Sequence, residues 1–178
     1  MTAEFSWQEH NGAGPSITGS IANINFGSTD SADLVPLSYP ITAGDYSYEK
    51  YISGSFGGTF TKIDNVQFWK SAGDYVTDET IFWTGSETSY TQPVSTKSSS
   101  AVGSVPTADP GTANVSIDGS LTGSLIAVGS TDFIVLQLET TTSTPAGAVN
   151  QKTFTLNYDE VWLPFSSNTT LNINYDLG

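Results

Sequence analysis

Aromatic and β-branched residues are denser in the stretch 56–83 than anywhere else in the chain, and they alternate with polar residues. Val66 and Phe68 share one parity, whereas Gln67 and Trp69 share the other. Successive side chains of a strand point to opposite faces, so a period of two indicates strands with one buried face. The stretch therefore predicts the central strands of an all-β domain.

Two irregularities make this central stretch more specific. The parity of the apolar positions slips at residues 62–65, which predicts a bulge or a tight turn there. Ile81, Phe82 and Trp83 are apolar in succession, which is typical of a strand covered on both faces or of one with an aromatic left exposed. We expect some of Trp69, Phe82 and Trp83 to meet another layer, a subunit or a ligand.

The rest of the chain predicts further strands separated by turn signals. No segment shows the helical period, and no repeat of fixed length is found. About nine short strands favour an antiparallel, jelly-roll-like β-sandwich. A chain of 178 residues needs no second core, so we divide it into an N-terminal arm, 1–15, and one sandwich domain, 16–178. Outside the central stretch, strands are expected at 16–26, 45–53, 113–117, 121–128, 132–140, 152–162 and 171–177.

Two later segments carry expectations of their own. In the most apolar strand, 132–140, Ile134 faces one way and Val135 the other, and Gln137 is expected to exit toward water. Residues 87–110 are rich in Ser, Thr and Pro and poor in large apolar side chains. A loop of this length inside a compact domain is uncommon and is usually functional or mobile.

The N-terminal arm is apolar, with Phe5 and Trp7 alternating ahead of a turn signal at residues 10–12. Such an arm can form an edge strand or dock onto a neighbouring subunit, and we favour the edge strand. Phe5 and Trp7 are accordingly candidates for contacts with a neighbour.

Charge and cysteine content exclude several classes of partner. The formal net charge is −13, from 18 acidic and 5 basic side chains, so we expect no binding to nucleic acid or to anionic membranes. The chain has no Cys, which removes disulfides, thiolate metal sites and a Cys nucleophile. The first residues lack a signal-peptide pattern and no stretch is apolar enough to span a membrane, which favours a protein made in the cytoplasm.

The sequence shows no catalytic constellation, and no cofactor is expected. His10 is the single histidine, and no Ser lies in the context of a nucleophile elbow. Asp74, Asp78 and Glu79 share one loop and form a weak candidate for calcium, because hard carboxylate oxygens suit this ion. The alternative is that these acids are solvated on the loop. A pair of carboxylates for glycoside hydrolysis stays open on the count of acids alone.

Trp69, Trp83 and Tyr90 are candidates for a sugar-stacking platform. Flat aromatic rings on a β-sandwich can stack against pyranose faces, although aromatic residues in strands more often bury their area in a core or at a subunit contact.

Five segments of the chain together resemble structural proteins of tailed bacteriophages. They cover residues 45–161 loosely: SYEKY at 47–51, GTF at 58–60, IDNVQFW at 63–69, TDFIVLQL at 131–138 and TFTLNYDEV at 153–161. The resemblance implies a β-sandwich of the virion, such as a capsid decoration or accessory head protein, and it transfers no functional residues.

The leading hypothesis is thus a non-enzymatic virion structural protein that binds the capsid lattice, itself or both. Its expected partners are the major capsid protein or another virion protein and further copies of the chain, with a trimer favoured. The alternative is a carbohydrate-binding β-sandwich module, and a carboxylate-dependent glycan hydrolase comes third.

Overall fold

The computed structural model describes residues 2–145, 151–162 and 169–177. These residues form ten strands and one short 3-10 helix, and within them no helix is long and apolar enough to cross a membrane. The elements are β1 (Ala3–Asn11), β2 (Ser16–Gly19), η1 (Pro36–Ser38), β3 (Lys50–Gly58), β4 (Lys62–Ala72), β5 (Glu79–Glu87), β6 (Gly103–Ser104), β7 (Gly129–Ser130), β8 (Phe133–Thr140), β9 (Thr153–Trp162) and β10 (Thr169–Leu177).

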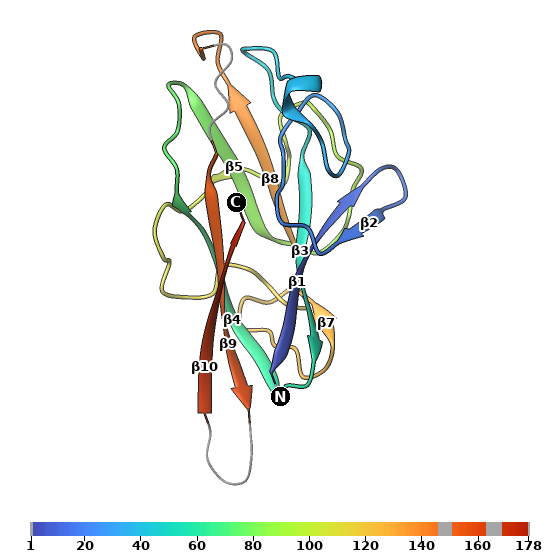
Figure 1. Cartoon of the computed structure of the whole chain (residues 1–178), viewed down its shortest axis with the longest axis vertical. Coiled ribbons are helices and arrows are strands. Elements are labelled where there is room, and N and C mark those ends of the chain that lie inside the picture. Colours follow the sequence, from blue (N-terminus) through green and yellow to red (C-terminus); the bar gives the residue numbers. More distant parts are fainter. Residues whose placement is uncertain (1, 146–150, 163–168, 178) are drawn as a thin grey trace.

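The strands form two antiparallel sheets of unequal size (Figure 1). The larger sheet has seven strands in the order β2-β1-β3-β8-β5-β6, with β7 pairing to β3 as well, and the smaller has three in the order β10-β9-β4. The predicted all-β, antiparallel sandwich is confirmed. The jelly-roll arrangement of its connections stays a prediction.

The main core lies between the two sheets and is rich in aromatic rings. Phe68 of β4 stacks on Phe154 of β9, with ring centroids 5.5 Å apart, and Phe56 of β3 meets Tyr158 of β9 edge-on at 4.8 Å. Trp7 of β1 also contacts Phe68, at 6.1 Å. Aromatic pairs in these geometries stabilise a core beyond their buried area. The dense aromatic stretch of the sequence thus supplies the contact between the sheets.

The outer face of the larger sheet is also covered, and this cover is the Ser/Thr-rich loop. Tyr51 and Val135 point away from the main core and pack with Ala101 of the loop in a second apolar cluster. Phe82, Tyr90 and Phe133 pack against the same cluster. The loop therefore covers the outer face of the larger sheet. The strand 81–83 is covered on both faces, as expected, because Ile81 and Trp83 pack on the main core and Phe82 packs on this second cluster.

Gln137 fixes this loop to the sheet, which corrects the expectation that it exits toward water. Its side chain is buried and accepts a hydrogen bond from the Ser98 backbone N–H at 2.7 Å. Its amide donates to the backbone oxygens of Thr96, at 2.8 Å, and Ser47, at 3.0 Å. A residue that alternation alone places in water is buried because a remote loop folds over it.

A second buried polar group ties the loop after β2 to the inner face of the larger sheet. Lys50 and Glu9 form an ion pair of 2.7 Å in which both side chains are almost fully buried. The Lys50 ammonium also donates to the Ser31 oxygen at 2.8 Å. Ile21 and Leu34 of the same loop are buried as well. The loop thus covers part of the inner face with apolar and polar contacts.

Several predicted boundaries are wrong for identifiable reasons. Residues 3–11 form β1 and are part of the sandwich, not a separate arm; residues 8–10 lie between β2 and β3, whereas residues 3–6 pair with β3 alone, as the expected edge strand does. The strand predicted at 16–26 ends at Gly19, after which the chain turns through Ser20 at a φ of 55°. Gly54 lies inside β3. Glycine fits there because a Cβ at this position would lie only 2.9 Å from the Phe5 ring.

One local prediction is confirmed, and a tight turn lies between the segments 113–117 and 121–128. The register of β4 against β9 shifts between Asp64 and Gln67, and Asn65 has a φ of 50°, which is the bulge expected from the parity slip. Asp118 and Gly119 have φ values of 51° and 74° and close a tight turn between Ile117 and Ser120. The strands predicted on either side of that turn are largely irregular.

We predict that Gln137→Leu destabilises the fold by about 2–4 kcal/mol, because the backbone groups of Ser98 and Thr96 lose their buried partners. Urea unfolding and limited proteolysis of loop 88–102 would measure both effects. Gln92→Leu, at an exposed position of the same loop, is the matched control and should change stability by less than about 0.5 kcal/mol. Equal effects of the two substitutions would contradict the anchoring role of Gln137.

Candidate binding cleft

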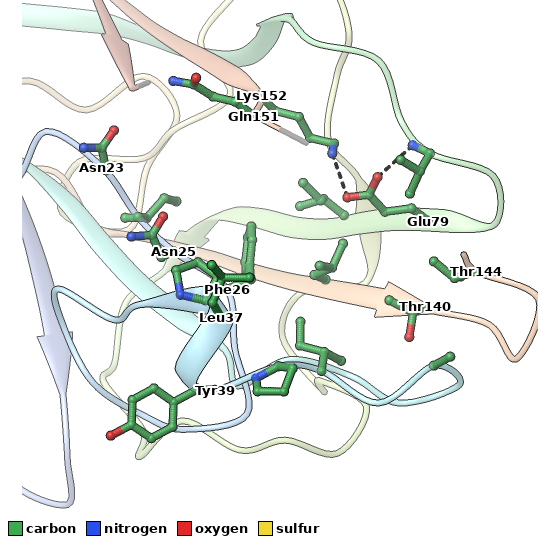
Figure 2. A pocket seen from close by; sticks show the side chains of 18 of the residues that line it. Asn23, Asn25, Phe26, Leu37, Tyr39, Glu79, Thr140, Thr144, Gln151 and Lys152 are labelled. Atoms are coloured by element: carbon green, nitrogen blue, oxygen red, sulfur yellow. Dashed lines mark hydrogen bonds and ion pairs between the residues drawn. The ribbon is translucent and has the colours of Figure 1, made fainter. Parts of the chain in front are cut away.

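An open cleft of about 640 Å³ lies at the end of the sandwich where β5 begins and β8 finishes (Figure 2). Its floor includes Ile81 of β5, Leu138 of β8 and Phe154 near the start of β9. Residues of the loop between β2 and β3, among them Ile24 and Phe26, form the opposite wall. A mostly apolar concavity of this size with a few polar groups is the usual form of a binding site.

Leu37 and Tyr39 line the rim of the cleft, and exposed Val35 precedes them in the same loop; we call these three apolar residues the cleft lip. Val35, Leu37 and Tyr39 are 56%, 80% and 46% exposed. Pro36 sets the first turn of η1 between them. The loop closes tightly behind the lip, because a Cβ on Gly27 would lie 2.5 Å from the Leu34 side chain and 2.8 Å from the Tyr39 oxygen.

An ion pair lies in the wall of the cleft. The Lys152 ammonium contacts a carboxylate oxygen of Glu79 at 2.7 Å, and the other oxygen accepts the Val76 backbone N–H at 2.9 Å (Figure 2). The side chains of Lys152 and Glu79 are only 5% and 8% exposed. The two charges therefore cancel inside the cleft and leave its interior close to neutral.

Tyr75 lies behind this ion pair with two lysines over its ring. The ammonium groups of Lys70 and Lys152 lie 5.1 and 5.4 Å from its centroid. Burial raises the pKa of the Tyr75 hydroxyl, and the charge of Glu79 raises it further. Tyr75 lies in the segment before β5, and Lys152 lies directly before β9. Their cation–π contact therefore holds the start of β9 against that segment.

The calcium candidate is not supported by the arrangement of its three acids. Within the described ranges, no three His, Asp or Glu side chains are grouped so that they could hold a metal ion. Glu79 instead bonds Lys152 and Val76. Asp78 lies in a turn with a φ of 61°, a conformation that Asp tolerates, and is exposed.

His10 is packed on the outer face of the larger sheet. Its ring meets Phe133 edge-on at 4.9 Å, and its Nε2 lies 3.1 Å from the Ser53 hydroxyl. Burial lowers the pKa of His10 from its ordinary value of 6.5. These contacts are those of a buried structural histidine.

The apolar residues predicted to contact a neighbour at the N-terminus lie in the core. Trp7 is 5% exposed. Phe5 is half-buried and packs against Phe56 at 5.3 Å and Tyr158 at 6.0 Å. They are covered because their side chains face the smaller sheet, where Phe5 packs on Tyr158 and Trp7 on Phe68, so in the folded monomer both belong to the core and are not contact residues for a neighbour.

The three aromatics predicted as a sugar platform lie on three different surfaces. Trp83 packs on the main core beside Phe68, with ring centroids 5.7 Å apart. Tyr90 belongs to the outer cluster, donates to the Gly12 oxygen at 2.6 Å, and has its pKa raised to about 12 by burial and then by Asp30. Trp69 is half-buried on the outer face of the smaller sheet, opposite in parity to Phe68. No shared platform results from these three positions.

A second exposed apolar surface lies in residues 121–128, which we call the apolar segment. Leu121, Ile126 and Val128 are 48%, 77% and 70% exposed. Leu125 and Ile63 exchange two backbone hydrogen bonds of 2.9 Å, so the segment is held against β4 while its neighbours face solvent. The sequence predicts a strand here, and strand alternation gives no sign that these side chains are exposed.

Comparison with known proteins finds no matching family model, no matching curated protein and no matching solved structure. Function is therefore argued from the cleft and the exposed surfaces themselves.

We predict that Lys152→Ala lowers the free energy of unfolding by about 2–4 kcal/mol, because Glu79 is left buried without its cation. Lys62→Ala is the matched control, since Lys62 pairs with Asp64 at the surface, and it should cost less than about 1 kcal/mol. Urea unfolding of both variants at one pH compares the two pairs. Similar losses would contradict a buried ion pair in the cleft wall.

We further predict that stability falls as the pH drops from about 7 to 5.5. Because the pKa of His10 is lowered in the folded state, the unfolded chain takes up a proton first below its ordinary pKa of 6.5. The loss is at most about 1.4 kcal/mol per pH unit. Urea unfolding at several pH values should show a smaller slope for His10→Gln, and an unchanged slope would contradict the prediction.

Proposed function

We propose that this protein is a non-enzymatic structural component of a tailed-bacteriophage particle, which acts by binding a neighbouring protein subunit through its apolar cleft. The observation that carries the proposal is the cleft itself, with its apolar floor, its exposed lip at Leu37 and Tyr39 and its neutralised charges. Exposed apolar surfaces of this kind mark sites of protein contact.

The chemistry of the cleft favours contact over catalysis. The charged side chains in its lining are Glu79 and Lys152, which are bonded to each other. His10, the chain's single histidine, is buried on the opposite face of the larger sheet. The setting in a virion rests on the resemblance of residues 45–161, and the mode of action rests on the cleft.

Purification of particles from an infected culture tests this proposal. We expect the protein to co-sediment with particles through a density gradient, and a Leu37→Ser/Tyr39→Ser variant to be lost from the particle fraction. Val102→Ser, at a residue 67% exposed away from the cleft, is the control and should stay bound. Recovery of the wild-type chain only in the soluble fraction would refute the proposal.

A further inference from the structure

Two short stretches of the chain, 35–39 and 121–128, hold six of the nine large apolar side chains that are exposed in the described part of the chain. One contains the cleft lip, and the other is the apolar segment. A monomer normally scatters such residues singly, so two such stretches indicate two contact surfaces.

The two surfaces lie at opposite ends of the larger sheet (Figure 1). The cleft includes Thr140, the last residue of β8. The apolar segment leads into β7, where Gly129 pairs with Phe56 near the far end of β3. Placed end to end, one molecule would present its segment to the cleft of the next.

The two surfaces also suit each other in their apolar character. The cleft is a mostly apolar concavity, and Ile126 and Val128 lie exposed on an irregular segment. Residues 119–131 carry no charge; of the two flanking acids, Asp132 accepts hydrogen bonds from Ser116 and Gly119, and Asp118 is exposed. In a chain with a net charge of −13, an uncharged segment and a cleft whose two charges are paired repel each other less than surfaces that carry unpaired acids.

We propose that the cleft binds the apolar segment of a second copy of the chain, with Ile126 and Val128 inserted beneath the lip formed by Leu37 and Tyr39. This inference rests on the proposed function, for which it names the partner. A contact between two different surfaces is heterologous, so it builds closed rings if its rotation closes and filaments if it does not. The contact is small, and repetition along an assembly supplies its strength.

Complementation between two variants of the full chain tests this inference. The segment variant, Ile126→Ser/Val128→Ser, keeps an intact cleft, and the cleft variant, Leu37→Ser/Tyr39→Ser, keeps an intact segment. All four positions are exposed, so both variants should fold, which circular dichroism checks. Sedimentation velocity from about 10 μM to about 1 mM covers the range in which small interfaces associate.

We expect the wild-type mass to rise with concentration, each variant alone to stay monomeric, and their equimolar mixture to form a one-to-one dimer that cannot extend. Val102→Ser should assemble like the wild type, and added NaCl should strengthen assembly by screening the repulsion between chains. A monomeric wild type at about 1 mM, or a mixture no more associated than its separate variants, would overturn the inference. If the monomeric chain still co-sediments with particles, the proposed function stands and the cleft binds another virion protein.

Discussion

The unequal size of the two sheets is the constraint on which the rest of this structure depends. Three strands cannot cover the inner face of seven, and apolar side chains left in water would cost stability in proportion to their area. The loop between β2 and β3 covers part of the remainder through Ile21, Leu34 and the Glu9–Lys50 ion pair. The cover is incomplete where β8 ends, and the cleft is the result.

The Ser/Thr-rich loop covers apolar side chains on the outer face of the larger sheet. Sheets with one solvated face alternate apolar and polar residues, yet Tyr51 and Val135 are fully buried on the outer face. Loop 88–102 covers them and is held by Gln137. A loop with few large side chains of its own can cover a sheet because the sheet supplies the aromatic rings and the loop supplies backbone partners.

Sequence periodicity located the long strands β4, β5, β8, β9 and β10, but it also predicted strands at 113–117 and 121–128, where the chain is largely irregular. The parity of Ile134 and Val135 places them correctly on opposite faces, and the slip near Asn65 marks a real bulge. Gln137 and Trp7 were misplaced, because burial by a distant loop or by the facing sheet leaves no trace in local alternation. The cleft was missed for the same reason, since its walls come from segments far apart along the chain.

The sequence by itself determined the all-β class, the strand faces and the exclusion of thiol chemistry, because these follow from side-chain period and residue type. Tertiary structure alone decided what packs against each face and loop, and so covered Phe5 and Trp7 with the smaller sheet and left Leu37, Ile126 and Val128 exposed. The physical reason is that exposure depends on what covers a residue. In this protein the covering groups include loops whose contacts are long-range and whose sequences carry no period.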